Sequence, residues 1–141
     1  MPKKHGSAHW EGSLKDGKGT VSMQSGALDA QPYGFNTRFE DKAGTNPEEL
    51  VAAAHASCFS MALSMVLGEA GMTATAIDTK CTVTLEEKDG GFAVTKSHLD
   101  VAVSVPGADE ADVIKACEGA KANCPISKLL TADITMEARV V

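Results

Sequence analysis

The sequence is poor in positive charge and in aromatic residues. Its 13 Lys and Arg residues are outnumbered by 19 Asp and Glu residues, which gives a formal net charge of −6, and its one basic pair is Lys3 with Lys4. Proteins that bind nucleic acids usually carry a basic surface, so we expect no nucleic-acid partner. Aromatic residues make up only 4% of the chain. Ala and Val must therefore fill much of the interior.

Metal-binding and targeting patterns are also missing. The four cysteines have no C-x2-C spacing and the four histidines are scattered, so no zinc site is expected. The first residues are polar and lack the apolar segment of a signal peptide, which predicts a cytosolic location. In that compartment cysteines are more often catalytic or redox-active than structural. The length of 141 residues suits a single domain, 1–141, with a sizeable core.

The longest uncharged stretch, residues 50–68, carries Cys58 near its middle. Nineteen residues approach the length of a membrane span, but the stretch holds three serines, a histidine and five alanines, so we expect no membrane association. A helix that is apolar on every side can instead be buried inside a protein. Burial disfavours the thiolate and makes a thiol inert. Cys58 is therefore either plain core or is reached by a cation from another part of the protein.

Hydrophobic periodicity predicts an α+β fold. Alternation over residues 7–14 and 20–23 predicts an N-terminal β-hairpin, and residues 30–44 are expected to form a long loop. A capping residue before Pro47, with two acids after it, predicts a helix that runs to about Gly68 or Gly71. Further strands are predicted at residues 77–85, 92–105 and 134–140, and helices at residues 109–122 and 125–130.

Several other residues could take part in thiol chemistry. His55 lies one turn before Cys58 on the same helix face and could tune its thiol, although a lone helical histidine is more often a hydrogen-bonded core residue. Cys124 precedes a proline, and a thiol at a helix N-terminus is stabilised as the thiolate; the alternative is a cysteine at a turn. Cys81 and Cys117 fall on the inward faces of a strand and a helix and are expected to belong to the core.

Arg38 is the cation that could serve Cys58. It lies among aromatic residues in the segment 32–40, and a packed guanidinium needs a carboxylate or thiolate partner. Glu48 is a candidate partner, although an acid in the first turn of a helix also complements the helix dipole. Glu48 and Cys58 are ten residues apart, about 15 Å along one helix. If Arg38 bridges them, they come from different chains of a homodimer with antiparallel central helices.

Three segments resemble the OsmC/Ohr family of thiol peroxidases, in its osmotically inducible OsmC branch. They are PYGFNTRFE (32–40), TNPEELVAAAHASCFSMAL (45–63) and NCPIS (123–127). The resemblance implies an intertwined α+β homodimer with antiparallel sheets around long central helices and sites at the interface. It also implies that Cys58 is the peroxidatic cysteine and Cys124 the resolving cysteine, and that Arg38 and Glu48 are their partners. The resemblance implies no role for Cys81 or Cys117, and their roles stay open.

The implied activity is the reduction of organic hydroperoxides and, more weakly, of hydrogen peroxide. Cys58 would become a sulfenic acid, Cys124 would convert it to a disulfide, and an external dithiol, dihydrolipoyl or similar, would reduce that bond. No metal and no cofactor are expected. Two alternatives remain open at this point. One is an acyl hydrolase that uses Cys58 with His55 as base, and the other is a non-catalytic dimeric binding domain.

Overall fold

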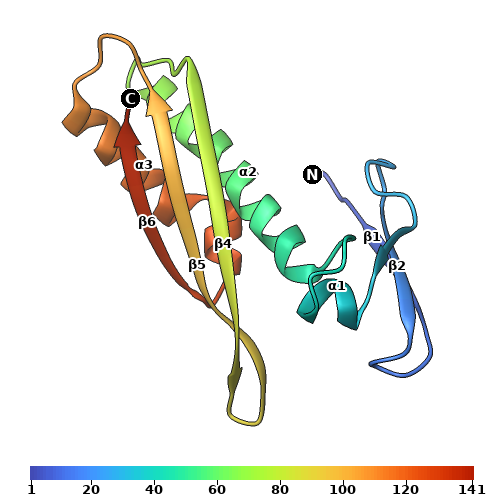
Figure 1. Ribbon diagram of the computed structural model, residues 1–141. Helices are drawn as coiled ribbons and strands as arrows, with labels where there is room; N and C mark the ends of the chain where they lie inside the picture. The colour runs from blue at the N-terminus through green and yellow to red at the C-terminus, as the bar shows by residue number, and fades with distance from the viewer. The chain divides into compact units, whose positions relative to one another are not determined.

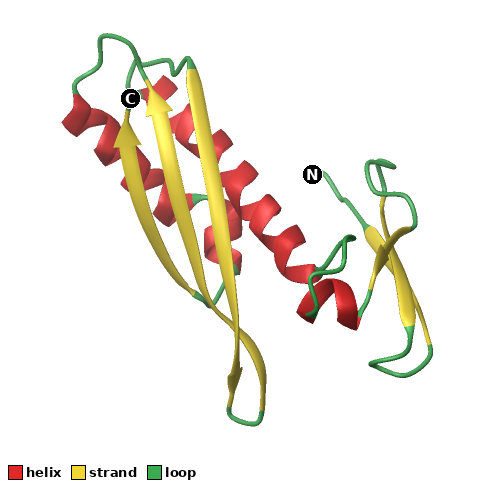
Figure 2. Ribbon diagram, in the orientation of Figure 1, coloured by secondary structure: helices red, strands yellow, loops and turns green.

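The computed structural model describes residues 1–141, which form two compact units, Met1–Leu50 and Val51–Val141. The first unit contains β1 (Gly6–Glu11), β2 (Lys18–Met23), β3 (Gln31–Tyr33) and α1 (Phe35–Phe39). The second contains β4 (Ala76–Lys88), β5 (Gly91–Ser104), α3 (Glu110–Asn123), α4 (Pro125–Leu129) and β6 (Asp133–Val140). The long helix α2 (Pro47–Glu69) begins in the first unit and continues in the second (Figure 1). Helices and sheets are mixed within the chain (Figure 2), and the predicted α+β class is confirmed.

The first unit is built on a three-stranded antiparallel sheet in the order β1-β2-β3. The rings of Trp10 on β1 and Tyr33 on β3 approach to 5.6 Å between centroids. Gly19 on β2 lies between them: a Cβ atom there would be 2.5 Å from the Tyr33 ring and 2.7 Å from the Trp10 ring. Only glycine leaves room for both rings at this position.

The long loop expected over residues 30–44 is wrong in part, because β3 and α1 lie within it. Gln31, Pro32 and Tyr33 pair with residues 19–21 of β2. Pro32 is tolerated because β3 is an edge strand, where a missing N–H leaves no ladder bond unmade. Thr37 in the first turn of α1 fixes the start of the helix, since its hydroxyl accepts a hydrogen bond from Gly34 N at 2.8 Å and donates to Gly34 O at 3.0 Å.

Helix α2 begins where its capping pattern predicts. Asn46 Oδ1 accepts a hydrogen bond from Glu49 N at 2.8 Å, which satisfies one of the free N–H groups of the first turn. Pro47 occupies the first helical position, where its fixed φ fits. The helix ends at Glu69, inside the predicted range. By length and composition alone it would suffice to cross a membrane, with a mean hydropathy of 1.8.

The second unit is a three-stranded sheet in the order β4-β5-β6. β4 and β5 form an antiparallel hairpin, and Asp89 and Gly90 at its tip have φ values of 53° and 82°, as a two-residue type I′ turn requires. β6 pairs with β5 in parallel, because the connection between them runs through α3 and α4. The expectation of antiparallel sheets is therefore wrong for this pair of strands. The part of α2 within this unit and α3 both lie on one face of the sheet (Figures 1 and 2).

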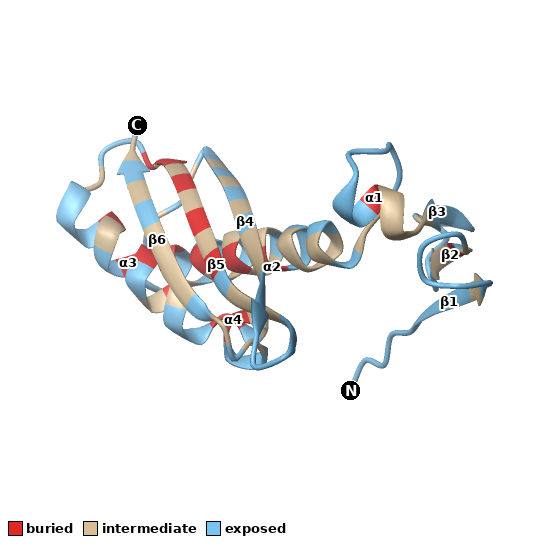
Figure 3. Cartoon of the chain, turned by 60° about the horizontal axis from the view of Figure 1, so that its bottom comes forward, coloured by how far each residue is buried: buried red, intermediate tan, exposed pale blue.

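The core of the second unit fills the space between that face and the two helices. Alternate residues of β5 are buried (Figure 3), as the periodicity predicts. Each fully buried aliphatic or aromatic side chain stabilises the fold by about 1.5–3 kcal/mol. This packing fixes the stretch of α2 that carries His55 and Cys58. The core contains Phe59, Leu63, Leu67, Leu99, Val101, Val103, Val105, Val113, Ala116, Cys117 and Ala120.

Candidate active site

The first unit holds Arg38 and Glu48 together as an ion pair. Arg38 lies on α1 and Glu48 in the first turn of α2. Nε of Arg38 donates to both carboxylate oxygens at 3.0 and 3.1 Å, and Nη2 donates to Oε1 at 2.5 Å. The Glu48 side chain is only 15% exposed and that of Arg38 is 36% exposed. The predicted pairing of these residues is therefore present, and Nη1 remains available to a further acceptor.

An apolar hollow of about 250 Å³ lies beside Arg38 in the same unit. The ring of Phe39 lies 5.4 Å from the Arg38 guanidinium carbon and packs on Phe35 with 4.9 Å between centroids. A guanidinium placed over an aromatic face is attracted by the quadrupole of the ring. The hollow is lined by Trp10, Leu14, Tyr33, Gly34, Phe35, Arg38, Phe39 and Pro47.

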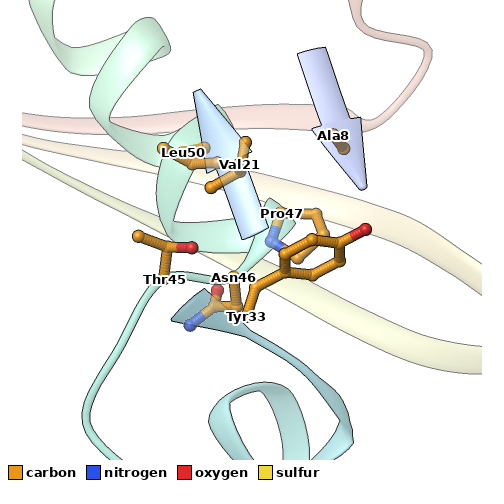
Figure 4. A pocket seen from close by; sticks show the side chains of 7 residues that line it. All are labelled: Ala8, Val21, Tyr33, Thr45, Asn46, Pro47 and Leu50. Carbon is orange, nitrogen blue, oxygen red and sulfur yellow. The ribbon is translucent and has the colours of Figure 1, made fainter. Parts of the chain in front are cut away.

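A second hollow of about 200 Å³ lies on the other side of Tyr33 and Pro47. Figure 4 shows its lining, which comes from the three strands of the first sheet and from the start of α2. Its walls are almost entirely apolar and contain no charged side chain. This hollow could therefore bind an apolar group, but it provides no catalytic side chain. The lining residues are Ala8, Val21, Tyr33, Thr45, Asn46, Pro47 and Leu50.

The second unit brings Cys58 and Cys124 together. Cys58 on α2 is half-buried and Cys124 is fully buried, and both thiols are free. Burial raises the pKa of the Cys58 thiol, the backbone of Ile126 acts in the opposite direction, and the neighbouring Cys124 thiol raises the pKa further. None of these neighbours is positively charged. The Cys58 thiolate therefore needs a cation from elsewhere if it is to form near neutral pH.

Cys124 lies at the junction of α3 and α4, where the sequence predicts the start of a helix. Its sulfur accepts a hydrogen bond from Ser127 N at 3.3 Å, so the cysteine serves as the N-cap of α4. Its thiol donates to the Ser127 hydroxyl, also at 3.3 Å. Two contacts from one residue fix the direction in which the Cys124 sulfur points.

His55 does not form a pair with Cys58. Its ring is fully buried, with Nε2 2.8 Å from Ser127 Oγ and Nδ1 2.7 Å from Ser97 Oγ. Burial lowers the pKa of His55, so the ring is neutral at pH 7. Because both ring nitrogens already have serine partners, the base that a Cys58 hydrolase would need is not formed.

Cys81 and Cys117 differ from one another. Cys117 belongs to the apolar core, as predicted, and burial raises the pKa of its thiol to about 11, with a further contribution from Glu118. Cys81 is half-buried on the inward face of β4, but its sulfur lies 3.1 Å from Ser97 Oγ. Burial raises the pKa of Cys81 and the Ser97 contact partly offsets that rise.

Sequence reasoning missed the two serines that hold His55. Ser97 occupies an inward position of β5, two residues before Leu99, and Ser127 lies one helical turn after Cys124. A polar residue on an otherwise apolar inward face is the signal that could have pointed to a buried polar partner. No group of three or more His, Cys, Asp or Glu side chains is placed to hold a metal ion.

Comparison with known proteins assigns the chain to a family. Residues 39–139 match the family model described as OsmC-like protein. The chain is 59% identical to Peroxiredoxin OsmC of Escherichia coli (strain K12) over 134 residues, which cover 95% of the chain and 94% of that protein. It is 29% identical to the organic hydroperoxide resistance protein OhrB of Bacillus subtilis (strain 168), over 84% of the chain and 86% of that protein.

Solved structures agree with the fold. The crystal structure of Bacillus subtilis OhrB superposes with a TM-score of 0.72 at 26% identity, covering 96% of this chain and 98% of that one. An OsmC-like protein of Vibrio cholerae O1 superposes with a TM-score of 0.77 at 17% identity, covering 99% and 100%. These likenesses confirm the predicted OsmC-like architecture, and the named peroxiredoxin confirms the predicted enzyme class, a thiol peroxidase. The chain belongs to the OsmC family.

Proposed function

We propose that this chain reduces organic hydroperoxides, and hydrogen peroxide more weakly, with Cys58 as the peroxidatic and Cys124 as the resolving cysteine. The observation that carries the proposal is the half-buried Cys58 thiol beside the buried Cys124 thiol. A thiol that peroxide can reach, next to one that it reaches poorly, is suited to oxidation followed by disulfide formation. The names of the OsmC and OhrB relatives support the same activity.

The reaction follows from these two sulfurs. The Cys58 thiolate attacks the distal oxygen of the hydroperoxide, the O–O bond breaks, and the proximal oxygen leaves and takes up a proton as an alcohol. Cys58 is left as a sulfenic acid. Cys124 then attacks the Cys58 sulfur, which releases water and forms a disulfide. An external dithiol, dihydrolipoyl or similar, reduces the disulfide by two thiol exchanges.

Arg38 supplies the positive charge that the Cys58 surroundings lack. Its guanidinium stabilises the thiolate and polarises the peroxide oxygen through Nη1, which Glu48 leaves available. Glu48 fixes the plane of the guanidinium through the bidentate contact. Arg38 therefore acts on Cys58 only where a second copy of the chain brings them together, because Glu48 and Cys58 are about 15 Å apart along α2.

A homodimer also accounts for the uncovered face of α2. Met61 and Met65 are 76% and 61% exposed, and Ala54 and Ser57 lie on the same face at helical spacing. An uncharged face of this kind is covered by another protein surface in most soluble proteins. The second copy, with its own α2 packed antiparallel, is the occupant that also completes the Arg38 site. In this proposal the protein functions as an intertwined homodimer.

The hollow beside Arg38 suits an organic hydroperoxide. Aromatic walls from Trp10, Phe35 and Phe39 would hold an apolar tail while the peroxide oxygens face the guanidinium. Among the apolar neighbours of Cys58 in the sequence, Met61 remains exposed, whereas Phe59 is fully buried in the core and cannot line a substrate site. Selectivity for organic substrates therefore rests on the aromatic hollow beside Arg38.

The two compact units act as one domain in this proposal. The match to the family runs from residue 39 to residue 139 and so crosses the boundary at Leu50. The protein works in the cytoplasm, where thiols are kept reduced between turnovers. The exposed face of α2 then meets a second copy rather than lipid.

The test is to treat the reduced protein with cumene hydroperoxide and to map its disulfides by mass spectrometry. We expect one bridge, between Cys58 and Cys124, and consumption of one peroxide per bridge. The Cys81→Ser and Cys117→Ser variants serve as controls and should form the same bridge. In the Cys124→Ser variant, Cys58 should be trapped by dimedone as a sulfenic acid. A bridge that includes Cys81 or Cys117, or no reaction at all, would overturn the proposal.

A further inference from the structure

A chain of five side chains links the Cys124 thiol to the interior of the second unit. The Cys124 sulfur lies 3.3 Å from Ser127 Oγ, which lies 2.8 Å from His55 Nε2. His55 Nδ1 lies 2.7 Å from Ser97 Oγ, and Ser97 Oγ lies 3.1 Å from the Cys81 sulfur. All distances are within hydrogen-bonding range for their atoms. We call this chain of Cys124, Ser127, His55, Ser97 and Cys81 the His55 relay.

Counting donors gives the order of its hydrogen bonds. The Cys124 sulfur accepts from Ser127 N, and its thiol donates to Ser127 Oγ. In the relay we assign the single O–H of Ser127 as the donor to His55 Nε2, which places the proton of the neutral ring on Nδ1, where it is donated to Ser97. The order runs from Cys124 inward. Every buried polar side-chain atom has a partner, which holds the serine rotamers in this arrangement.

We propose that Ser127 and His55 take the proton of the Cys124 thiol when Cys124 attacks the Cys58 sulfenic acid. Ser127 contacts the reacting sulfur, and His55 acts through Ser127 as a positioning and proton-accepting residue. Ser97 holds the His55 ring from its other nitrogen. This role lies outside the peroxide-reducing step and rests on the proposed function of Cys58 and Cys124.

The atoms balance in this step. The thiol proton passes to Ser127 Oγ as the proton of Ser127 passes to His55 Nε2. The Cys124 sulfur forms the S–S bond, the S–O bond of Cys58 breaks, and hydroxide leaves. Hydroxide takes up one proton from solvent and the imidazolium returns one, so the net products are the disulfide and one water. Cys124 is oxidised and the sulfenic sulfur of Cys58 is reduced.

The surroundings of His55 suit a transient proton acceptor. The groups that face it are neutral at rest: Ser97 from β5, Cys81 from β4, whose sulfur lies 3.8 Å from Nδ1, and Ser127 from α4. Burial is the cause that lowers the pKa of His55, and no charged side chain contributes. The ring therefore rests neutral with an unprotonated Nε2 that accepts from Ser127, and the imidazolium becomes favourable when a Cys124 thiolate forms beside Ser127.

Two steps can be timed separately to test the relay. Reduced protein is mixed with cumene hydroperoxide and quenched, and Cys58 sulfenic acid is counted as the dimedone adduct while the Cys58–Cys124 disulfide is counted by mass. We expect His55→Gln and Ser127→Ala to leave Cys58 oxidation within about twofold and to slow disulfide formation by at least about tenfold. His98→Gln is the matched control and should behave as wild type. His98 lies on β5 and makes a hydrogen bond with Thr135 on the neighbouring strand β6, outside the His55 relay.

Alkaline pH distinguishes a lost proton acceptor from a lost shape. Solvent hydroxide can remove the Cys124 proton when His55 cannot, so disulfide formation in both variants should recover toward the wild-type rate as pH rises. Wild-type rates in folded Ser127→Ala and His55→Gln, or a slow rate that stays flat with pH, would refute the relay. If His55→Gln does not fold, the rate of disulfide formation in Ser127→Ala alone tests the relay. Absence of any Cys58 sulfenic acid in Cys124→Ser would instead refute the proposed function.

Discussion

The Glu48 carboxylate accepts hydrogen bonds from two nitrogens of the Arg38 guanidinium, Nε and Nη2. The third nitrogen, Nη1, makes no hydrogen bond to Glu48. A bidentate contact fixes a plane, whereas a single contact fixes only a distance. The pair is also sheltered, since Glu48 is mostly buried. The structure therefore contains an oriented cation, held by one unit, and a pair of thiols without a cation, held by the other.

This orientation predicts that charge alone will not replace Arg38. Arg38→Lys keeps the charge but cannot make the bidentate contact, so we expect Cys58 oxidation by cumene hydroperoxide to slow by about 100-fold. The measurement is the initial rate of peroxide loss in the presence of excess dithiol. Arg139→Lys is the control, because Arg139 pairs with Asp100 at the surface. Equal rates for the two variants would remove Arg38 from the mechanism.

The proposed sharing of the site between two copies has its own prediction. Glu48→Ala and Cys58→Ser are each expected to be nearly inactive. When the two variants are unfolded together and refolded, half of the molecules should be mixed pairs with one intact site each, so about a quarter of wild-type activity should return. Refolding each variant alone is the control. Recovery no greater than in the separately refolded samples would indicate a site within a single chain.

The exposed face of α2 predicts the effect of a charge placed there. Met65→Asp puts an unpaired carboxylate into a surface that the proposed dimer desolvates, so we expect a monomer by sedimentation velocity at micromolar concentration. Val141→Asp, at a position that is 72% exposed, should leave the oligomeric state unchanged. Identical sedimentation of both variants with wild type would show that α2 does not form the contact. If the wild-type protein instead co-sediments with lipid vesicles, lipid rather than a second copy covers this face of α2.

The buried neutral His55 predicts a pH dependence of stability. Its pKa is lowered in the folded state, so below about 6.5 the unfolded chain binds a proton that the folded chain does not. This contribution is fully present above pH 6.5 and is lost as pH falls, by at most about 1.4 kcal/mol per pH unit. Urea unfolding of wild type and His55→Gln at several pH values measures it. The free-energy difference between the two should shrink between pH 7 and pH 5; a constant difference would contradict the assignment.

Cys117 should matter for stability and not for catalysis. Cys117→Ser places a hydroxyl among apolar side chains and should lower the free energy of unfolding by about 1–3 kcal/mol, while peroxide reduction by the folded fraction stays at the wild-type rate. Its raised pKa, about 11, also predicts that a thiol reagent at pH 8 labels Cys117 only in urea. Rapid labelling of Cys117 in the folded protein would disagree with its burial.

Much of the fold follows from local patterns in the sequence. The Asn46–Pro47 start of α2, the Asp89–Gly90 turn and the alternation along β5 each fix their element through neighbouring residues alone. β3 did not follow, because Gln31, Pro32 and Tyr33 become a strand only by pairing with β2. A strand of three residues is too short to show an alternating hydrophobic pattern in the sequence.

The candidate site was predictable as a set of residues but not as a geometry. The segment motifs single out Arg38, Glu48, Cys58 and Cys124, yet no local pattern states that Cys58 and Cys124 are neighbours 66 positions apart. The role of His55 was the harder case. Proximity along α2 suggests Cys58 as its partner, whereas the ring turns to Ser97 and Ser127, which lie 42 and 72 positions away.

The continuity of α2 from Pro47 to Glu69 has a consequence for how the protein behaves at low abundance. In the proposed dimer, Glu48 from the first turn of one α2 and Cys58 from the other chain complete each site, so an isolated chain lacks a complete site. Specific activity should then fall on dilution even when every chain is folded, and the fall should be steeper at temperatures that weaken subunit association. Protein concentration would thus set how much peroxide each molecule removes.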